Sequence, residues 1–349
     1  MRNMILATLS LTAFGCADNY LASEQSLSGH QQDVSAMAMA TEATPTNSKW
    51  QLIWQDEFSA DSIDSTKWSF EQNCFGGGNS ERQCYTNRSE NAFIDDGVLV
   101  IKAIKEDFTG PAKGDDDPSY DISDTRTQPY TSARLRSKDK GDWRYGRFEI
   151  RAKLPQGQGS WPAIWMLPTD WAYGSWPLSG EIDIMEAVNL YAKSDADTPP
   201  ANGLENRIHG TLHYGEKWPN NTYTGTGFTL PTGVNPADGF HVYAVEWEQG
   251  EIRWYMDGIH YATQRAENWF SGAVDAKANK YAPFDQRFHM ILNLAVGGAW
   301  PEAVNEKGVD DSVFPQTMQV DYVRVYQCPI NKETGLGCAT IGEQALLVK

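Results

Sequence analysis

The sequence predicts an all-β domain in the form of a jelly roll, a sandwich of two curved antiparallel sheets. From residue 50 to residue 326 the apolar side chains recur with a period of two, the spacing of half-buried strands. Thirty glycines and 17 prolines supply frequent turns, and the sequence shows no long amphipathic helical pattern. The segment is too long for an immunoglobulin-type sandwich of about 100 residues, so a jelly roll fits it better.

The individual strands follow from alternation and from the turn signals between them. Over residues 147–154 charged and apolar side chains alternate strictly, as they do in a strand with one buried face. Further strands are predicted at residues 98–101, 241–247, 252–256 and 318–326. Two-residue turns that contain glycine are predicted at 96–97, 249–250 and 257–258. Strands and turns in this order predict hairpins.

The composition disfavours several classes of protein. Asp and Glu outnumber Lys and Arg by 46 to 29, which gives a net charge of −17. Nucleic acid and anionic lipid surfaces are therefore unfavourable partners. No apolar run reaches the roughly 18 residues that a membrane-spanning helix needs. Transporters, DNA-binding proteins and helical bundles are poor candidates.

The N-terminus has the pattern of a secretory signal. Arg2 precedes a short apolar stretch, residues 4–14, and small residues follow up to Cys16. Two interpretations of Cys16 stay open: acylation as a bacterial lipoprotein cysteine, or cleavage near Gly15 that leaves it without a role. Ala13 stands where a lipobox usually has leucine, which weakens the first. We expect an exported protein, either secreted or held at the outer membrane or cell surface by a lipid on Cys16.

The rest of the chain divides by composition. Residues 17–46 are rich in Ser, Ala, Thr, Gln and Glu without any strand or helix period, so we interpret them as a flexible linker after a signal at 1–16. No second linker appears within residues 47–328, which we take as a single domain. Residues 329–349 form a C-terminal tail, too short for a domain and of unknown role.

Four cysteines follow the signal segment, in two close pairs: Cys74 with Cys84, and Cys328 with Cys338. They allow three pairings, of which loop closure favours the local one. Metal binding is the weaker interpretation, because no Cys-x-x-Cys motif or nearby histidine pair exists. We expect two structural disulfides in an oxidising compartment, or free thiols if the chain stays reduced.

Residues 180–188 carry the clearest chemistry, because this apolar strand pattern contains three carboxylates. On a regular strand Glu181 and Asp183 share one face, and Glu186 points to the opposite face. One inserted residue, a β-bulge at Ile184 and Met185, returns Glu186 to the face of the other two. Acidic neighbours on one face repel, and strands are depleted in them. We therefore interpret the cluster as a functional site.

Clustered carboxylates can bind a hard cation through oxygen, or act as nucleophile and acid/base on a glycosidic bond. The tryptophans around them favour sugar, because aromatic faces stack on the apolar faces of pyranose rings. We predict substrate contacts for Trp161, Trp165, Trp176 and Trp218. One or two of the tryptophans that precede the acids are expected to be buried. Trp161 and Trp176, flanked by Ser, Gly and Pro, should be the most exposed.

A further strand pattern at residues 208–214 places His209, Thr211 and His213 on one face. A histidine beside carboxylates can orient them or bind the substrate. We predict such a role for His213 and regard His209 as the lesser candidate, since a single histidine is more often structural.

The sequence Glu-Ile-Asp-Ile-Met-Glu at residues 181–186 resembles the active-site signature of glycoside hydrolase family 16, in its bulged form E-x-D-x-x-E. The resemblance extends over residues 47–328. The segments that carry it resemble the first strand, the approach to the site and the closing strand of the family, at residues 50–58, 145–149 with 160–168, and 321–326.

The resemblance implies a concanavalin A-like jelly roll with an open cleft that cuts β-glucans or related galactans with retention. It implies that Glu181 is the nucleophile, Glu186 the general acid/base and Asp183 the auxiliary carboxylate between them. Asp183 is a like-charged neighbour, which raises a proton affinity in the cluster. No cofactor is implied for catalysis. A polysaccharide is then the partner, and we expect a monomer.

The resemblance also implies a structural Ca²⁺ on the convex face. Its ligands would be the backbone oxygens of Glu57 and Gly97 and the side chain of Asp321. In the alternative interpretation Asp321 is only a capped or solvated acid.

The bulged signature is similar to that of laminarinases, agarases and κ-carrageenases, and differs from that of lichenases. A protein of charge −17 is a poor host for sulfated carrageenan. Residues 161–168 and 209–214 look most like those of laminarinases, so we predict an endo-acting β-1,3-glucanase. A β-agarase or other galactan hydrolase is the alternative enzyme. A non-catalytic glycan-binding module is the alternative outside the enzymes, and it should have lost Glu181 or Glu186.

Overall fold

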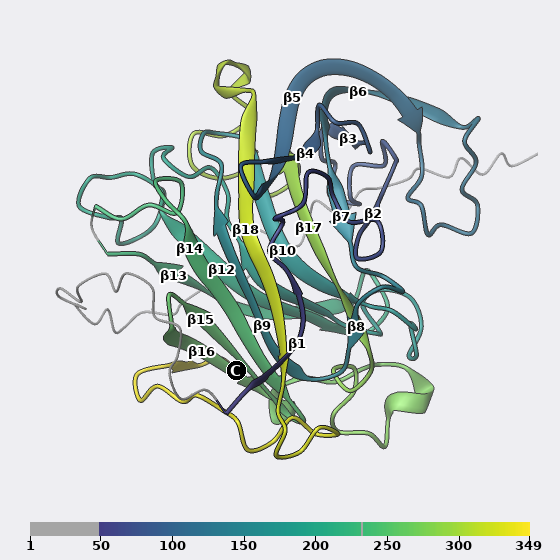
Figure 1. The fold of residues 1–349 in the computed structure, drawn as a ribbon, viewed down its shortest axis with the longest axis vertical. Coiled ribbons are helices and arrows are strands. Elements are labelled where there is room, and N and C mark those ends of the chain that lie inside the picture. The colour runs from purple at the N-terminus through teal and green to yellow at the C-terminus, as the bar shows by residue number, and fades with distance from the viewer. Residues whose placement is uncertain (1–48, 232) are drawn as a thin grey trace, which may run out of the picture.

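Strands dominate the computed structural model, which describes residues 49–231 and 233–349 (Figure 1). Within these residues the helical segments are three short 3-10 turns, η2 (Ala266–Asn268), η3 (Val274–Ala276) and η4 (Asp311–Val313). The strands are β1 (Gln51–Asp56), β2 (Ser69–Phe70), β3 (Gln83–Tyr85), β4 (Ala92–Asp95), β5 (Val98–Pro111), β6 (Thr125–Ser132), β7 (Arg134–Arg136), β8 (Asp142–Trp143), β9 (Gly146–Lys153), β10 (Ser160–Pro168), β11 (Glu181–Glu186), β12 (Arg207–Gly215), β13 (Asn221–Thr229), β14 (His241–Glu248), β15 (Glu251–Met256), β16 (Ile259–Arg265), β17 (Phe288–Val296), β18 (Gln316–Gln327) and β19 (Leu346–Leu347). The predicted all-β class is confirmed.

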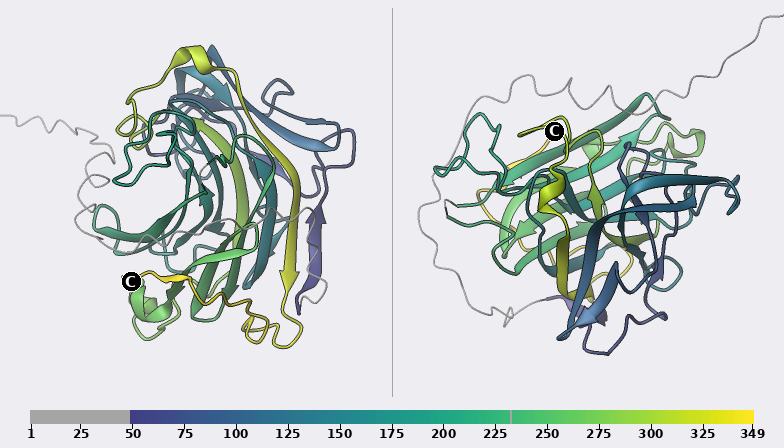
Figure 2. Two further views of the ribbon diagram at one scale, coloured as in Figure 1. Left: turned by 90° about the vertical axis from the view of Figure 1, so that its left-hand side faces the viewer. Right: turned by 90° about the horizontal axis from the view of Figure 1, so that it is seen from above.

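The strands form two sheets that stack as curved layers (Figure 2). The larger sheet has the order β19-β16-β15-β14-β9-β18-β5-β6-β3, with β1 beside β18 and β4 beside β5. The smaller sheet has the order β13-β12-β11-β10-β17-β7-β2, with β8 beside β17. Nearly all neighbouring strands are antiparallel; β16 with β19 and β3 with β6 are the parallel pairs.

The core lies between the sheets and follows from the alternation in the sequence. In β9 the side chains of Phe148, Ile150 and Ala152 are fully buried, and the charged residues between them face the other way. Ile182 and Ile184 of β11 enter the same cluster from the smaller sheet. Because burial of apolar area is the main favourable term in folding, this pattern fixes which face of each strand points inward.

The predicted hairpins are present. Asp96 and Gly97, both with positive φ (48° and 76°), connect β4 to β5, and Asp257 and Gly258 connect β15 to β16 in the same way. Two consecutive residues in the left-handed region match the twist of a two-residue hairpin turn. The run predicted at 98–101 is longer in the structure, because β5 continues to Pro111 and pairs there with β6.

The first strand of the described chain lies beside β18 on the larger sheet. β1 runs antiparallel to β18, with Gln51 opposite Gln327, and the two strands lie side by side in Figure 1. Both cysteine pairs are disulfides with the local pairing, Cys74–Cys84 and Cys328–Cys338. Cys16, the signal at 1–16 and the linker at 17–46 lie outside the described residues.

The C-terminal tail is part of the sheet and not a loose extension. Its strand β19 pairs with β16, and the Thr340 backbone N–H donates to the buried carboxylate of Glu246. The Gly342 N–H donates to Nδ1 of His260. No helix of the described residues is long and apolar enough to cross a membrane.

Candidate active site

The acidic strand β11 has the predicted bulge. Opposite β12, Asp183 pairs with Thr211 and Glu186 with His209, so three steps along β11 match two steps along β12. This extra residue places Glu181, Asp183 and Glu186 on one face, where all three line a single cavity. Ile184 and Met185 are both buried, in the core cluster.

The adjacent strand β12 brings histidines to the acids, as its alternation predicted. His213 lies opposite Glu181, with Nε2 at 3.7 Å from Glu181 Oε1 and at 3.3 Å from Asp183 Oδ2. His209 lies opposite Glu186 and packs its ring edge-on against Trp300. The structure therefore places His213 among the carboxylates, and its role in the site stays a prediction.

Trp161, at the start of β10, does not have the exposure that its small neighbours predicted. Its side chain is only 7 % exposed, because Trp300, Val188 and Ala295 pack around it. Its indole Nε1 donates a hydrogen bond to Glu186 Oε1 at 3.0 Å. The expectation that Trp161 is among the most exposed tryptophans is wrong, because the loop after β17 covers the ring.

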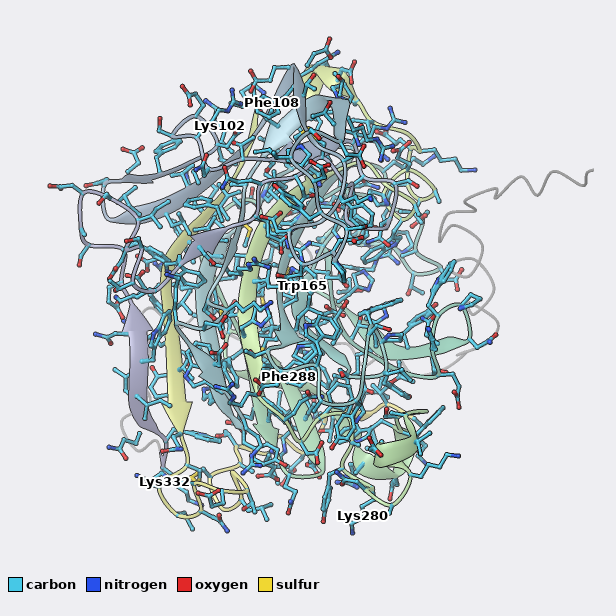
Figure 3. The ribbon with its side chains drawn as sticks, turned by 90° about the vertical axis from the view of Figure 1, so that its right-hand side faces the viewer. Lys102, Phe108, Trp165, Lys280, Phe288 and Lys332 are labelled. Atoms are coloured by element: carbon cyan, nitrogen blue, oxygen red, sulfur yellow. A yellow bond between two sulfur atoms is a disulfide. The ribbon has the colours of Figure 1, made fainter. Side chains whose placement is uncertain are left out.

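Trp165 and Trp176 are partly exposed, and both lie near the acids. Trp165 lines the cavity from β10, and its Nε1 donates to Asn293 Oδ1 at 2.7 Å. It lies between Phe108 toward one end of the molecule and Phe288 toward the other (Figure 3). Trp176, in the loop before β11, donates its Nε1 to Glu181 Oε2 at 2.7 Å.

Trp218 is not among the residues that line this cavity. It belongs to the loop between β12 and β13 and is 43 % exposed. Its contact with the substrate stays a prediction. The contact requires a sugar chain that extends beyond the three acids.

The opposite wall of the cavity comes from a segment that the sequence did not single out. Gly77, Asn79, Glu81 and Tyr85 face the acids from the loop closed by the Cys74–Cys84 disulfide and from β3. The signal for this loop was present, because three consecutive glycines between two nearby cysteines indicate a fixed turn. Only the fold shows that the turn faces β11.

A hydrogen-bond network joins this wall to the floor of the cavity. Glu81 accepts from Gln83 Nε2 at 2.6 Å and from the Tyr85 hydroxyl at 3.3 Å. The Tyr85 hydroxyl also accepts from Nδ2 of Asn293, the residue that accepts from Trp165. Asn293 and His289 are the two polar residues of the otherwise apolar strand β17, and a polar side chain within such a run is a signal that the sequence offered. The network holds the loop and the Trp165 ring in one arrangement.

Arg134 of β7 is the cation that lines the cavity. Its guanidinium stacks over the Trp165 ring, 4.6 Å from the ring centre, and pairs with Glu71 at 3.1 Å. Because Arg134 is paired with Glu71, its positive charge does not neutralise the acidic side chains that line the cavity.

The surroundings shift the protonation of the site in a consistent direction. Burial and the charge of Asp183 raise the pKa of Glu181 to about 7, against the cation His213 and the Trp176 hydrogen bond. Burial and the same Asp183 charge hold the pKa of Glu186 well above its usual range. The nearby carboxylates raise the pKa of His213 to about 9 although burial opposes its charge. Near neutrality the site therefore holds a protonated Glu186, a cationic His213 and a Glu181 that can ionise.

His209 has the opposite environment. Burial lowers its pKa to about 4, with a smaller contribution from Arg207. It is therefore neutral at neutral pH and packs against Trp300, which is the structural interpretation of a single buried histidine.

Two sets of groups can be considered for a metal. One ligand atom each from Glu181, Asp183 and His213 lie within 4.8 Å of one another, but a protonated His213 offers no lone pair. Of the expected calcium ligands, Asp321 belongs to β18 on the larger sheet, Glu57 directly follows β1 and Gly97 directly precedes β5. The Asp321 Oδ2 pairs there with Arg151 at 2.6 Å.

This arrangement can cut a glycosidic bond. A buried protonated carboxyl can give a proton to a leaving oxygen, and a second carboxyl that ionises more readily can attack the anomeric carbon. A cavity with aromatic and polar walls suits a sugar, which has apolar faces and a rim of hydroxyls.

Comparisons with known proteins agree with this chemistry. The family profile described as "Beta-porphyranase A-D, GH16 domain" matches residues 50–328. A β-glucanase of Rhodothermus marinus is 42 % identical over 80 % of this chain and 85 % of its own length. Glucan endo-1,3-β-glucosidase A1 of Niallia circulans is 40 % identical over 85 % of this chain, but the chain spans only 40 % of that protein.

Solved structures show the same fold. The laminarinase of Rhodothermus marinus has a TM-score of 0.60 and 40 % identity, over 79 % of this chain and 97 % of its own. The endo-β-1,3-glucanase of Pyrococcus furiosus has a TM-score of 0.62 and 36 % identity, over 79 % of this chain and 94 % of its own.

Proposed function

Because the chain belongs to glycoside hydrolase family 16, a family that acts with retention, we propose that it is an endo-acting hydrolase of β-1,3-glucan of the laminarin type. Glu181 is the nucleophile, Glu186 the general acid/base, and Asp183 the auxiliary carboxylate. The observation that carries this proposal is the bulged strand β11, which presents the three acids together in one cavity.

In the first step Glu181 and Glu186 act together. The carboxylate of Glu181 attacks the anomeric carbon while Glu186 gives its proton to the glycosidic oxygen, and the bond to the leaving sugar breaks. Burial and Asp183 raise the pKa of both acids and His213 opposes them, but the pKa of Glu181 reaches only about 7 while that of Glu186 is held well above its usual range. Glu181 is therefore the more readily ionised of the two.

In the second step the roles reverse. Glu186, now a carboxylate, takes a proton from water as the water oxygen attacks the anomeric carbon. The ester to Glu181 breaks, Glu181 leaves as a carboxylate, and the product keeps its configuration. No cofactor takes part in either step.

A galactan is the second candidate substrate, because the matching family profile is that of β-porphyranases and a keratan-sulfate endo-1,4-β-galactosidase is 31 % identical. The charges of the cavity favour a neutral glucan. Glu81 adds a further acidic side chain to the three of β11, Arg134 is paired with Glu71, and the cation His213 faces Glu181 and Asp183. A sulfated sugar would meet repulsion here without a free cation.

The test is the release of reducing ends from laminarin, lichenan, agarose and porphyran, measured side by side at equal mass. We expect laminarin to be cut fastest, and proton NMR of the first product to show the β-anomer. Faster release from agarose or porphyran would replace the glucan assignment with the galactan one. A first product of α configuration would overturn the assignment of Glu181 as a nucleophile.

A non-catalytic module is the third candidate, because the β-1,3-glucan-binding protein of Penaeus monodon is 34 % identical. Such a module should have lost Glu181 or Glu186, and this chain has both. Binding of laminarin without release of reducing ends would support the module and exclude the enzyme.

A structural calcium ion is part of the proposal, and the residues fit it. Asp56 pairs with Val323 and Leu99 with Val320, so Glu57 and Gly97 flank Asp321 along one edge of β18. The Glu57 carboxylate pairs with Arg324, which leaves its backbone oxygen as the ligand. Two carbonyl oxygens and a carboxylate are the hard donors that Ca²⁺ prefers.

Export and a monomeric state complete the proposal. The signal pattern of residues 1–16 and the two disulfides suit an oxidising compartment. If Cys16 carries a lipid, the protein partitions into the detergent phase of Triton X-114 and Cys16→Ala moves it to the aqueous phase. Light scattering after gel filtration tests the monomer.

A further inference from the structure

Each acid of the β11 motif is contacted by a different tryptophan through an indole N–H. Trp176 donates to Glu181 Oε2 at 2.7 Å, and Trp161 donates to Glu186 Oε1 at 3.0 Å. Trp254 of β15 crosses the core and donates to the backbone oxygen of Asp183 at 2.7 Å. The donors come from three separate segments: a loop, β10 and the opposite sheet.

The position of Trp161 does not suit a sugar platform. Trp300 packs edge-on against its ring, with 5.6 Å between the ring centres, and the side chain is 7 % exposed. The N–H edge of the Trp161 indole, and not its face, is directed at Glu186. Trp176 likewise directs its N–H edge at Glu181, and its ring lies beside that of His213 at 5.9 Å.

We propose that Trp161 and Trp176 are positioning residues, which hold Glu186 and Glu181 through their indole N–H groups, and are not primarily stacking platforms for sugar. The inference rests on the proposed roles of the two acids. The hydrogen bonds fix one oxygen of each carboxyl and leave the other for the substrate, so proton donor and nucleophile are held before the sugar binds.

The two hydrogen bonds also favour the ionised forms of the acids. An N–H donated to a carboxylate lowers its pKa, in opposition to burial. Other titratable groups face the same acids: Asp183 from β11, His209 and His213 from β12, Arg134 from β7, and Glu81 and Tyr85 across the cavity. These groups remain in the variants below, so a change can be assigned to the lost N–H.

The test uses Trp176→Phe and Trp161→Phe in the full chain, with the pH dependence of kcat/KM measured on whichever polysaccharide the wild type cuts fastest. Trp176→Phe should raise the pKa of Glu181 and move the acid limb to higher pH by about one unit, because a lost charge-assisted hydrogen bond is worth about that much. Trp161→Phe should raise the pKa of Glu186 and move the alkaline limb to higher pH instead. In both variants kcat should fall about tenfold and KM should change little.

Trp50→Phe is the matched control. Its Nε1 donates to the buried carboxylate of Glu246 at 3.2 Å on the other sheet, so the variant loses the same kind of bond away from the site. Trp50→Phe should lower the melting temperature and leave the acid and alkaline limbs of the kcat/KM profile unchanged. If Trp161→Phe and Trp176→Phe raise KM while both limbs stay fixed, the tryptophans are sugar platforms and the proposal is wrong.

A second measurement keeps the test valid if a phenylalanine variant does not fold. Protein with ¹⁵N-labelled indoles is compared with its Glu181→Gln and Glu186→Gln variants by NMR. Each carboxamide should move one indole N–H resonance strongly, and a different one in each case. Failure to move two different resonances would contradict the proposal. If the wild type cuts none of the polysaccharides, the proposed function fails, and the NMR result still decides the hydrogen bonds.

Discussion

Glu181 and Glu186 lie on one strand and share most of their neighbours, yet their pKa values differ. Burial and Asp183 raise the pKa of Glu181 to about 7, against His213 and the Trp176 N–H. Burial and Asp183 hold the pKa of Glu186 well above its usual range, against His213 and the Trp161 N–H. Two carboxyls whose environments separate their pKa values are the arrangement that acid and nucleophile require.

The first prediction concerns these acids. Glu186→Gln should lower kcat on laminarin by a factor on the order of 10²–10⁴, because the proton donor is lost. Glu181→Gln should lower it further, because no covalent intermediate can form. Azide should restore activity to Glu186→Gln on activated substrates, since the nucleophile survives. Asp183→Asn should lower kcat less than either glutamine variant does. Wild-type turnover in either glutamine variant would refute the assignment.

The same variants have a predictable effect on stability. A carboxyl whose pKa is raised by folding destabilises the native state as pH rises from about 4.5 through the folded value. For Glu181 that window extends from about 4.5 to about 7. Replacement of Glu181 by glutamine removes this loss of stability. The melting temperature of Glu181→Gln at pH 7.5 should therefore equal or exceed that of the wild type, and the difference should vanish at pH 4.

The second prediction concerns His213. Its charge lowers the pKa of Glu181, and its own pKa is about 9. His213→Gln removes the charge, so the acid limb of kcat/KM should move above pH 7. His209→Gln is the control, because a neutral His209 contributes no charge. An unchanged acid limb in His213→Gln would contradict the electrostatic role.

At the scale of the element, the bulge in β11 is fixed from the opposite sheet. The Trp254 indole donates to the Asp183 backbone oxygen, and Gly210 of β12 leaves room for it. A Cβ at Gly210 would lie 2.4 Å from Trp254 Cδ1. The bulge is therefore held by packing of the whole sandwich as well as by its own sequence.

The third prediction is the deletion of Met185. The acids would then alternate without a bulge, but every residue after them would shift by one against β10 and β12. The variant also loses a fully buried side chain, so its free energy of unfolding should fall by about 3 kcal/mol or more. Urea unfolding measures this. A stable deletion variant with a lichenase profile would show that the spacing alone sets specificity.

At the scale of the whole molecule, β18 joins distant parts of the chain. It pairs with β1, β5 and β9, and the chain after it returns to the sheet through Cys328–Cys338 and β19. A cation between Glu57, Gly97 and Asp321 would connect three of these segments.

The fourth prediction is that EDTA lowers the melting temperature and leaves activity at 25 °C unchanged. At a calcium concentration 100 times Kd the ion stabilises folding by about 2.7 kcal/mol, which corresponds to about 5 °C. Asp321→Ala should have a similar effect and make the protein insensitive to EDTA. Arg151→Ala is the control, since it removes only the partly exposed ion pair with Asp321, worth about 0–1 kcal/mol. A melting temperature unmoved by both EDTA and Asp321→Ala would exclude the site.

The sequence alone determined the class of fold, the hairpin turns and the grouping of the three acids. These features are local: alternation sets the buried face of a strand, Asp-Gly sets a tight turn, and one extra residue between Asp183 and Glu186 sets the bulge. The local cysteine pairing was favoured for the same reason, because short loops close at the lowest entropic cost.

Only the tertiary structure decided what surrounds the acids. Glu81 and Tyr85 line the same cavity from the Cys74–Cys84 loop and from β3, far earlier in the chain, and Arg134 reaches it from β7. Trp161 reads in the sequence as an exposed aromatic between small residues, yet the segment after β17 covers it. A periodic pattern shows which face of a strand is buried but not which distant segment lies against it. Burial is the largest cause of the raised pKa of both Glu181 and Glu186, and the distant segments that pack over the acids contribute to that burial.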